Sequence, residues 1–171
     1  MTLAKDLLNE LKQEAAVTRR YLERVPFDKL EFRPHEKSEP LGRQAVHVAE
    51  IVAWWKDVLT NEELDFIDFE PKEFTTREQL LSYFDDLLAA AVKVLSAAKA
   101  KDFEKEWSMR NGETVYFTLP KKQVLRTFAM NHLVHHRAQL GMYLRLLEIP
   151  VPAAYGPSAD DFDVILINKY E

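Results

Sequence analysis

The sequence predicts an all-α protein, an antiparallel four-helix bundle that forms a single domain over residues 1–171. Apolar residues recur at steps of three and four over long stretches, which is the pattern of amphipathic helices. Only four glycines occur, and the eight prolines stand at the ends of these stretches rather than inside them. A chain of 171 residues is long enough for one complete hydrophobic core and short for two.

Four apolar stripes define the predicted helices, which cover residues 2–25, 41–59, 75–99 and 120–147. Thr2 is suited to cap the first helix, and Pro26 follows its end. Thr75 and Glu78 have the spacing of a capping box at the start of the third helix. Pro120 suits the first position of the fourth helix, since a first-turn residue needs no N–H donor.

Three connecting segments have patterns of their own. Residues 60–74 contain a proline and many acidic residues, and they are predicted to form a long loop. Asn111-Gly112 stands between two strand-like runs, so residues 105–118 are predicted to form a short β-hairpin or an ordered irregular loop. Residues 159–170 are predicted to form a short last helix.

The composition excludes several classes of protein. The net charge is −5, from 28 acidic and 23 basic residues, and the basic residues form no stripe, so we expect no nucleic-acid partner. No uncharged stretch approaches the roughly 18–20 apolar residues that span a bilayer, so we expect no membrane association. Residues 1–6 lack the apolar run of a signal peptide, and we expect a cytoplasmic protein. The absence of cysteine excludes disulfides and a cysteine nucleophile.

Two of the five histidines stand on one face of the predicted fourth helix. At about 100° per residue, His132 and His136 are about 40° apart and one turn from each other. Two imidazoles in these positions can bind one ion at about 2 Å from each ring nitrogen. His47 lies on the apolar stripe of the predicted second helix, from which it can meet the pair inside a bundle. Three histidines without a fourth protein ligand are typical of a catalytic metal site with one open position.

The alternative is that these histidines are ordinary packed side chains, because a short His-x-x-x-His pair is a degenerate motif. However, buried neutral histidines need partners for both ring nitrogens, and neighbouring ones on an apolar face are costly without them. These requirements favour a metal site over simple packing, with His47, His132 and His136 as the candidate ligands of one divalent ion. We predict that His135, about 100° from His136, and His35, in a loop, do not bind this ion.

Several other residues are candidates for a role in catalysis. Glu50 stands one turn from His47. Three roles are open to it: a hydrogen-bond partner of that histidine, a base that acts on bound water, or an exposed salt-bridge residue. Arg137, Tyr143 and Arg145 on the fourth helix are candidates to bind an anionic group, and the alternative for an arginine is a surface position. The hairpin segment adds three candidates that would either line the mouth of a pocket or serve only as packing residues: Trp107, Arg110 and Tyr116.

Residues 131–140, Asn-His-Leu-Val-His-His-Arg-Ala-Gln-Leu, resemble the fourth-helix signature of the DinB-like family, the damage-inducible YfiT-like helical bundles. Residues 143–160 are similar to the tail of that family, and residues 32–50 are similar to its first-to-second helix region. The likeness covers nearly the whole chain in the right order. One departure is Glu148, where many members have a glycine before Ile-Pro.

The resemblance implies a metal site of His47, His132 and His136, commonly occupied by nickel or zinc. Relatives transfer low-molecular-weight thiols to electrophiles or catalyse thiol-dependent isomerisation, and many are assigned as hydrolases. We therefore expect a metal-dependent hydrolase or thiol S-transferase that acts on a small molecule, with a thiol cosubstrate in the second case. The alternative is a non-catalytic, stress-associated metal-binding bundle.

The resemblance also implies a homodimer, and two adjacent tryptophans favour the same expectation. Trp54 and Trp55 lie about 100° apart on the predicted second helix, so a narrow core stripe does not easily hold both. The alternative is that both are buried within one broad face of the bundle.

Overall fold

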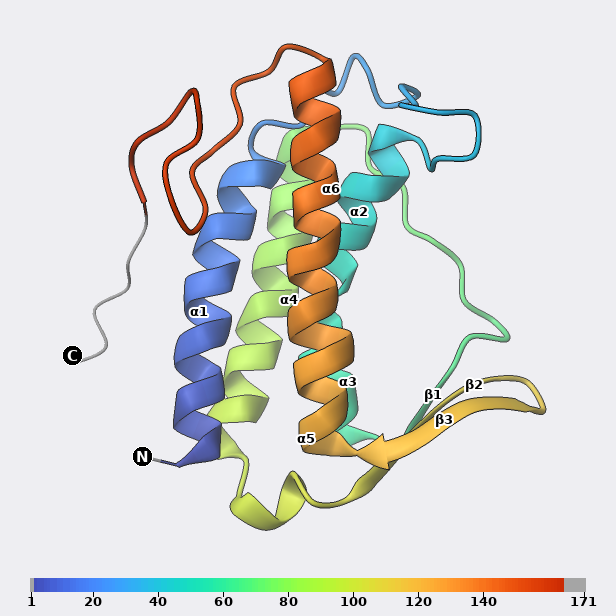
Figure 1. The fold of residues 1–171 in the computed structure, drawn as a ribbon. Helices are drawn as coiled ribbons and strands as arrows, with labels where there is room; N and C mark the ends of the chain where they lie inside the picture. Colours follow the sequence, from blue (N-terminus) through green and yellow to red (C-terminus); the bar gives the residue numbers. More distant parts are fainter. Residues whose placement is uncertain (1, 165–171) are drawn as a thin grey trace.

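The computed structural model describes residues 2–164, which form a predominantly helical fold (Figure 1). Its helices are α1 (Leu3–Leu22), α2 (Leu41–Glu50), α3 (Ala53–Thr60), α4 (Arg77–Ala97), the 3₁₀ turn η1 (Ala100–Asp102), α5 (Lys121–Val124), the π-helical segment η2 (Leu125–Asn131) and α6 (His132–Leu146). The predicted helical class is confirmed. The predicted second helix consists of α2 and α3, and the predicted fourth consists of α5, η2 and α6. No helix within the described residues is long and apolar enough to cross a membrane.

Side-chain caps explain where two of the long helices begin. The Thr2 hydroxyl accepts a hydrogen bond from the backbone N–H three residues further on, as expected for the cap of α1. The capping box of α4 consists of Thr76 and Gln79, one residue after the predicted pair of Thr75 and Glu78. Gln79 sets this register because its side-chain oxygen accepts hydrogen bonds from the backbone N–H groups of Thr75 at 3.0 Å and Thr76 at 3.3 Å.

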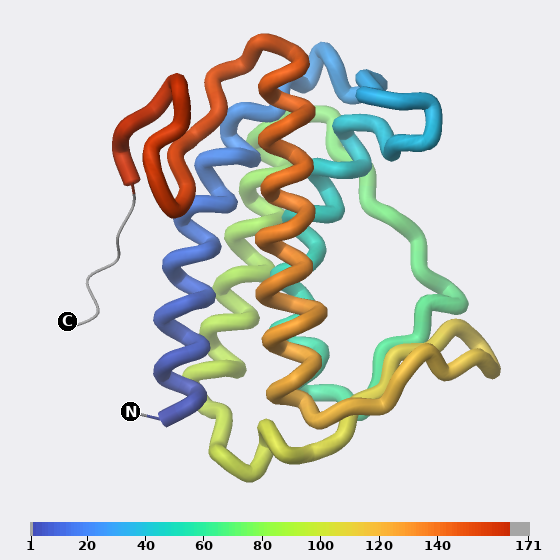
Figure 2. Tube along the Cα trace, viewed as in Figure 1, coloured from blue at the N-terminus to red at the C-terminus, as the bar shows by residue number. Residues whose placement is uncertain are grey.

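The long helices do not alternate in direction as the sequence predicts. Arg19 on α1 forms an ion pair with Asp85, and Arg77 donates a hydrogen bond to the carbonyl of Val25, so α1 and α4 are antiparallel. The connection over residues 61–76 brings the chain back to the end where α2 begins, so α4 runs in the same direction as α2 and α3 (Figure 2). An extended connection of this length reaches about 50 Å, which exceeds the roughly 30 Å length of α4.

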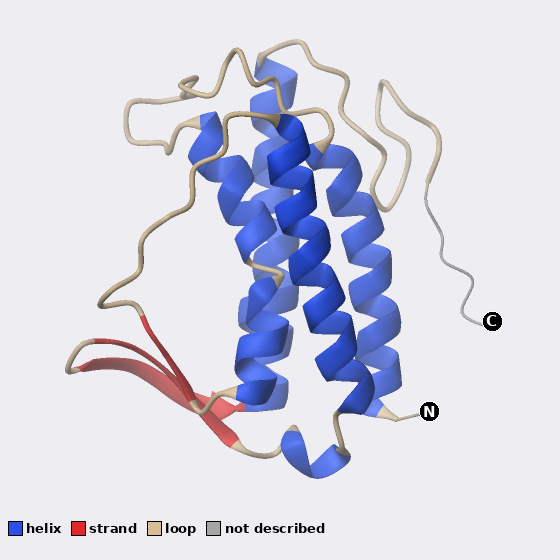
Figure 3. Ribbon diagram, turned by 180° about the vertical axis from the view of Figure 1, so that it is seen from behind, coloured by secondary structure: helices blue, strands red, loops and turns tan. Residues whose placement is uncertain are grey.

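A small sheet lies beside one end of the helices (Figure 3). Its strands are β1 (Glu63–Asp65), β2 (Glu106–Asn111) and β3 (Thr114–Pro120), in the order β1-β2-β3. The predicted hairpin is therefore present, and its two-residue turn begins at Gly112, whose φ of 57° suits the first central position of a type II′ turn. Strand β1 lies within the predicted loop over 60–74 and pairs in parallel with β2. A strand of three residues is too short to show an alternating pattern.

The two adjacent tryptophans have different surroundings. Trp55 is fully buried in the core. Trp54 is half-buried, and its ring lies 5.6 Å from that of His132 between centroids. Neither ring is left over as an exposed apolar surface, so the tryptophan pair gives no support to a dimer interface.

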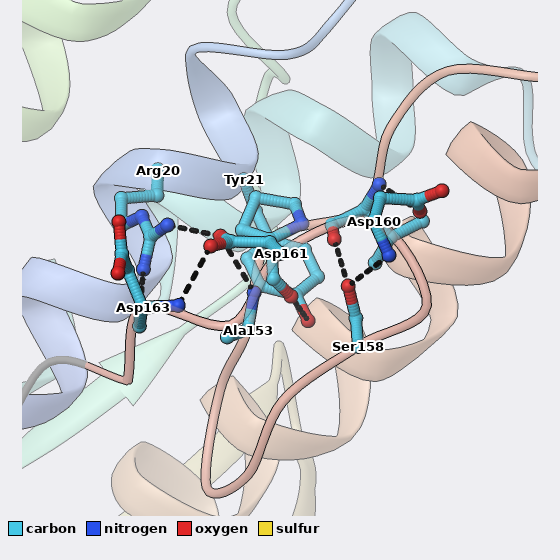
Figure 4. A network of polar contacts seen from close by, with 9 residues as sticks. Arg20, Tyr21, Ala153, Ser158, Asp160, Asp161 and Asp163 are labelled. Carbon is cyan, nitrogen blue, oxygen red and sulfur yellow. Dashed lines mark hydrogen bonds and ion pairs between the residues drawn. The ribbon is translucent and has the colours of Figure 1, made fainter.

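The chain after α6 forms an irregular segment that two aspartates hold against α1 and α6 (Figure 4). The Asp161 carboxylate accepts a hydrogen bond from the Ala153 backbone N–H at 3.0 Å and pairs with Arg20 on α1. Asp160 binds the backbone in a similar way and pairs with an arginine of α6. The predicted helix over 159–170 is not formed as far as residue 164, and its remainder lies outside the described residues. Both aspartates bind distant backbone instead of starting a helix.

Glu148, two residues after the end of α6, is strained because its φ of 58° lies in the left-handed region. The Ile149 N–H bonds the Leu144 carbonyl at 2.9 Å and the Glu148 N–H bonds the Arg145 carbonyl at 3.0 Å, which is the Schellman pattern. Glycine is the residue that adopts this conformation without strain. The departure from the family pattern at Glu148 thus falls on a position where glycine fits better.

Replacement of Glu148 by glycine is expected to stabilise the protein by about 1 kcal/mol, or about 2–4 °C in Tm. Thermal unfolding followed by circular dichroism measures this difference. Glu148→Ala keeps the strain and is the matched control, so a glycine variant that is no more stable than the alanine variant would contradict the explanation.

Candidate metal centre

Two packed helices bring three histidines together. His47 lies near the end of α2, and His132 and His136 lie in the first two turns of α6. The π-helical segment η2 ends at Asn131, directly before the first of these α6 histidines. Such segments occur mostly as local bulges in α-helices and are frequent at functional sites. The sequence pattern did not predict η2, because a segment of seven residues is too short for its period to be told from that of an α-helix.

The three side chains each offer one ring nitrogen, and these nitrogens all lie within 4.8 Å of one another. The Nε2 atoms of His47 and His132 are 3.4 Å apart. Two nitrogens at about 2.0–2.1 Å from a tetrahedral ion are about 3.3–3.4 Å apart, so this pair fits a metal ion. The ring centroids of His47 and His136 are 4.4 Å apart. The structure thus brings together the three histidines that the sequence predicts as ligands.

Neighbouring groups orient the imidazoles. The Nδ1 atom of His132 lies 3.3 Å from the carbonyl oxygen of Phe128, and a carbonyl only accepts, so Nδ1 carries the proton and Nε2 keeps its lone pair. This is the second contact that a metal-ligating histidine usually makes. Gln44 donates to the backbone oxygen of His136 at 2.9 Å, and its amide nitrogen lies 3.3 Å from Nδ1 of the same residue. Gln44 therefore holds the α2 and α6 sides of the site together.

The three imidazoles are neutral at physiological pH. Burial, followed by the charges of His136, His132 and Arg43, lowers the pKa of His47 to about 3. Burial and the neighbouring histidines lower the pKa of His136 to about 4, and burial also lowers the pKa of His132. A neutral imidazole is the form that binds a metal ion, so these environments favour ligation.

The metal-free protein is expected to lose stability as the pH falls from about 6.5 toward 4. In this window the unfolded chain takes up protons on His47, His132 and His136, whereas the folded state does not, because its pKa values are lowered. The free energy of unfolding therefore rises with pH up to about 6.5 and then levels. Urea unfolding of chelator-treated protein at several pH values between 5 and 7 measures how the free energy of unfolding changes with pH. This range lies above that in which carboxylates titrate.

The matched variant is His47→Gln, which removes one titrating group without adding a charge. Its stability is expected to fall less steeply between pH 6.5 and 5 than that of the wild type. Parallel curves for the two proteins would show that this histidine is not responsible for the acid sensitivity.

Glu50 is held close to the histidines. Its carboxylate forms an ion pair with Arg43 at 2.8 Å and accepts a hydrogen bond from the Lys72 backbone N–H at 3.4 Å. One carboxylate oxygen is 4.0 Å from Nδ1 of His47, which is too long for a hydrogen bond. Glu50 is buried, so the exposed position that the sequence left open for it does not occur.

The other candidate residues of the fourth helix point elsewhere. Arg137 is buried and contacts Glu14 and Thr18 on α1 and Tyr155 in the C-terminal segment. Tyr143 is buried and donates a hydrogen bond to the backbone oxygen of Glu39. Arg145, also on α6, pairs with Asp160. The three hairpin candidates have other surroundings: Arg110 pairs with Glu63 and Asp65, Trp107 is buried, and Tyr116 is exposed.

A cleft with a volume of about 540 Å³ opens beside the histidines. His47 and His132 line it together with Arg43, Glu50, Ala53, Trp54, Asp57, Leu64, Phe66, Phe69, Glu70, Lys72, Tyr83 and Met109. The hairpin contributes Met109 to the wall rather than the three hairpin residues that the sequence suggested. Trp54 and Asp57 were detectable in principle, because they follow His47 at helical spacing, whereas the loop residues carry no such signal.

The sequence model of the DinB family matches residues 1–168. A DinB-like protein from Bacillus subtilis has a similar structure, with a TM-score of 0.63 and 16% identity over 84% of this chain and 92% of that one. A DinB-like protein from Bacillus cereus has a TM-score of 0.63 and 19% identity over 86% of this chain and 94% of that one. At such identities the likeness shows the fold alone, and no curated protein matches significantly. Because the family pattern spans nearly the whole sequence, the chain belongs to the DinB family.

Proposed function

We propose that the protein is a metal-dependent enzyme in which His47, His132 and His136 bind one divalent ion, zinc or nickel, beside a cleft for a small molecule. The observation that carries this proposal is the position of two of these imidazoles in the wall of a cleft of about 540 Å³. That volume lies within the range of small-molecule sites, roughly 300–1,000 Å³. A purely structural metal site has four protein ligands and no such opening.

The donor set suits the proposed metals, because imidazole nitrogen is a good ligand for both zinc and nickel. When bound, such an ion supplies a Lewis acid that lowers the pKa of a water molecule or a thiol. The chain has no cysteine, so a nucleophilic sulfur would belong to a small-molecule cosubstrate.

Glu50 is the residue best placed to accept a proton from a nucleophile in the cleft. It lines the cleft, and its carboxylate is fixed by the Arg43 guanidinium and by the Lys72 backbone N–H. A carboxylate fixed in this way keeps one orientation toward an entering water or thiol. Trp54 and Phe66 contribute aromatic rings to the lining of the same cleft.

The experiment that tests the proposal uses protein loaded with cobalt(II), whose visible spectrum reports its coordination. Addition of 2-mercaptoethanol is expected to change this spectrum in the wild type, because one coordination position is open. Turnover of 1-chloro-2,4-dinitrobenzene with the thiol would identify the S-transferase type, and thiol-independent hydrolysis of 4-nitrophenyl acetate the hydrolase type. In either case Glu50→Gln is expected to retain the metal and to lose at least about tenfold in rate. An unresponsive spectrum and no turnover would favour the non-catalytic metal-binding bundle.

We also propose a homodimer, on the family resemblance alone. Light scattering is expected to give twice the chain mass of 19.9 kDa, and a mass of one chain at micromolar concentration would reject the dimer.

A further inference from the structure

The cleft extends away from the histidines to Asp57 on α3. We propose that this part of the cleft binds an organic ammonium group, so that the substrate carries an amino group at the end remote from the metal. The inference rests on the proposed function in one respect, because that function places the reacting group of the substrate at the histidines. The ammonium site itself depends only on Asp57 and the aromatic residues that line the same cleft.

One continuous helical face forms the floor of the cleft. His47, Glu50, Trp54 and Asp57 follow one another at steps of three, four and three residues, and all four line the cleft. The break between α2 and α3 does not interrupt this face, because Ile51 keeps right-handed helical dihedral angles. At about 1.5 Å per residue, the ten steps from His47 to Asp57 correspond to about 15 Å along the helix axis. A ligand that reaches both ends is therefore an extended small molecule.

Among the described residues, Asp57 is the half-buried carboxylate of this cleft that has no charged partner. Glu50 is paired with Arg43 at 2.8 Å, and Glu70 is exposed at the rim. Within residues 2–164 no hydrogen bond or ion pair reaches the Asp57 carboxylate. Burial raises the pKa of Asp57, and the charge of the exposed neighbour Lys56 offsets this only in part. A cation in the cleft would supply the missing charge.

The aromatic rings that line the same cleft as Asp57 are surfaces that cations favour. The aromatic residues of the cleft are Trp54, Phe66, Phe69 and Tyr83. A cation is attracted to the face of an aromatic ring within about 6 Å of its centroid. Two of the rings already accept cations of the chain: Lys72 Nζ lies 5.7 Å from the Tyr83 centroid, and the Arg43 guanidinium carbon lies 6.0 Å from that of Phe69. Arg43 is already paired with Glu50, so this cation of the cleft wall is not free to bind an anionic ligand.

Three probes with one six-carbon chain test the site: n-hexylammonium, n-hexanol and hexanoate. Binding to zinc-loaded protein is followed by NMR through the indole N–H signals, with the Trp54 signal assigned from Trp54→Phe. We expect the Trp54 signal to shift with hexylammonium, while the buried Trp55 and Trp107 signals move little. Hexylammonium is expected to bind at least about tenfold more tightly than hexanol, as a charge pair in a partly desolvated site allows.

Asp57→Asn keeps the shape of the side chain and removes its charge, so it is expected to abolish the preference for hexylammonium. Asp28→Asn, which alters an exposed carboxylate outside the cleft, is expected to leave the preference unchanged. Equal binding of hexylammonium and hexanol, tighter binding of hexanoate, no binding of hexylammonium, or an unchanged preference in Asp57→Asn would each overturn the proposal. Zinc content is measured on the same samples, so a failure of the metal site is recognised separately from a failure of the ammonium site.

Discussion

Wild-type protein produced with excess zinc or nickel is expected to contain close to one metal ion per chain, and His136→Ala is expected to contain at most about a tenth as much. Loss of one of three imidazoles removes a third of the donor set, and even changes outside the ligands often cost 10–100-fold in metal affinity. Elemental analysis after gel filtration measures the content. The metal is also expected to leave the wild type as the pH falls below about 6, because protons compete for each imidazole.

His135→Ala and His35→Ala are the controls for this result. His135 is exposed next to the site, and His35 is exposed in the loop before α2, so neither change is expected to alter the metal content. Far-UV circular dichroism of the His136→Ala variant is expected to match the wild type, because the apolar core does not depend on the ion. Equal metal content in wild type and His136→Ala, or none in either, would return these histidines to the status of packed side chains.

Arg137→Ala is expected to destabilise the protein by about 3–5 kcal/mol, or about 10 °C in Tm, although it leaves the histidines untouched. The Arg137 side chain is 2% exposed and pairs at 2.7 Å with Glu14, which is 12% exposed. Without the guanidinium, the carboxylate of Glu14 stays buried with only the Tyr155 hydroxyl as a donor. Burial raises the pKa of Tyr155 to about 12, so this hydroxyl remains protonated and neutral. Urea unfolding at pH 7 measures the loss.

Two further variants identify the cause. Arg126→Ala removes an arginine of similar size from an exposed ion pair with Glu10, and it is expected to cost less than about 1 kcal/mol. In the double variant Arg137→Met/Glu14→Leu, no charge remains buried, so much of the lost stability is expected to return. A double variant as unstable as Arg137→Ala alone would show that lost packing, and not an unpaired carboxylate, is the main effect.

The histidine cluster could be predicted because its geometry is mostly local. His132 and His136 share one helix face by their spacing alone, and only the meeting with His47 required a bundle. The caps and the hairpin were likewise local, and the error of one residue at the α4 cap arises because Thr75 and Thr76 have the same capping preference. Local patterns thus located the candidate ligands and, to within a residue, the helix caps and the hairpin.

The remaining features depend on contacts between distant segments. Arg137 was a candidate for the site because it follows His136 directly in the sequence. One residue along a helix is a rotation of about 100°, which points Arg137 toward α1. There it contacts Glu14, some 120 residues earlier in the chain. The cleft wall depends on β1, a strand that exists only through its parallel pairing with β2. The direction of α4 depends on where the connection over 61–76 leads. No periodicity encodes such relations.

The residues that line the cleft come from two parts of the fold, and this decides which of them can be changed without loss of the fold. The histidines stand on α2 and α6, which also build the core, whereas Phe66 and Phe69 belong to a connection outside the bundle and Met109 to the projecting hairpin (Figure 3). Changes in a surface connection cost little folding free energy, whereas changes in core helices are expensive. Under the proposed function, substrate preference would be open to redesign at these three wall positions while the helices that carry the histidines stay constant. A library confined to them would explore new ligands beside an unchanged histidine cluster.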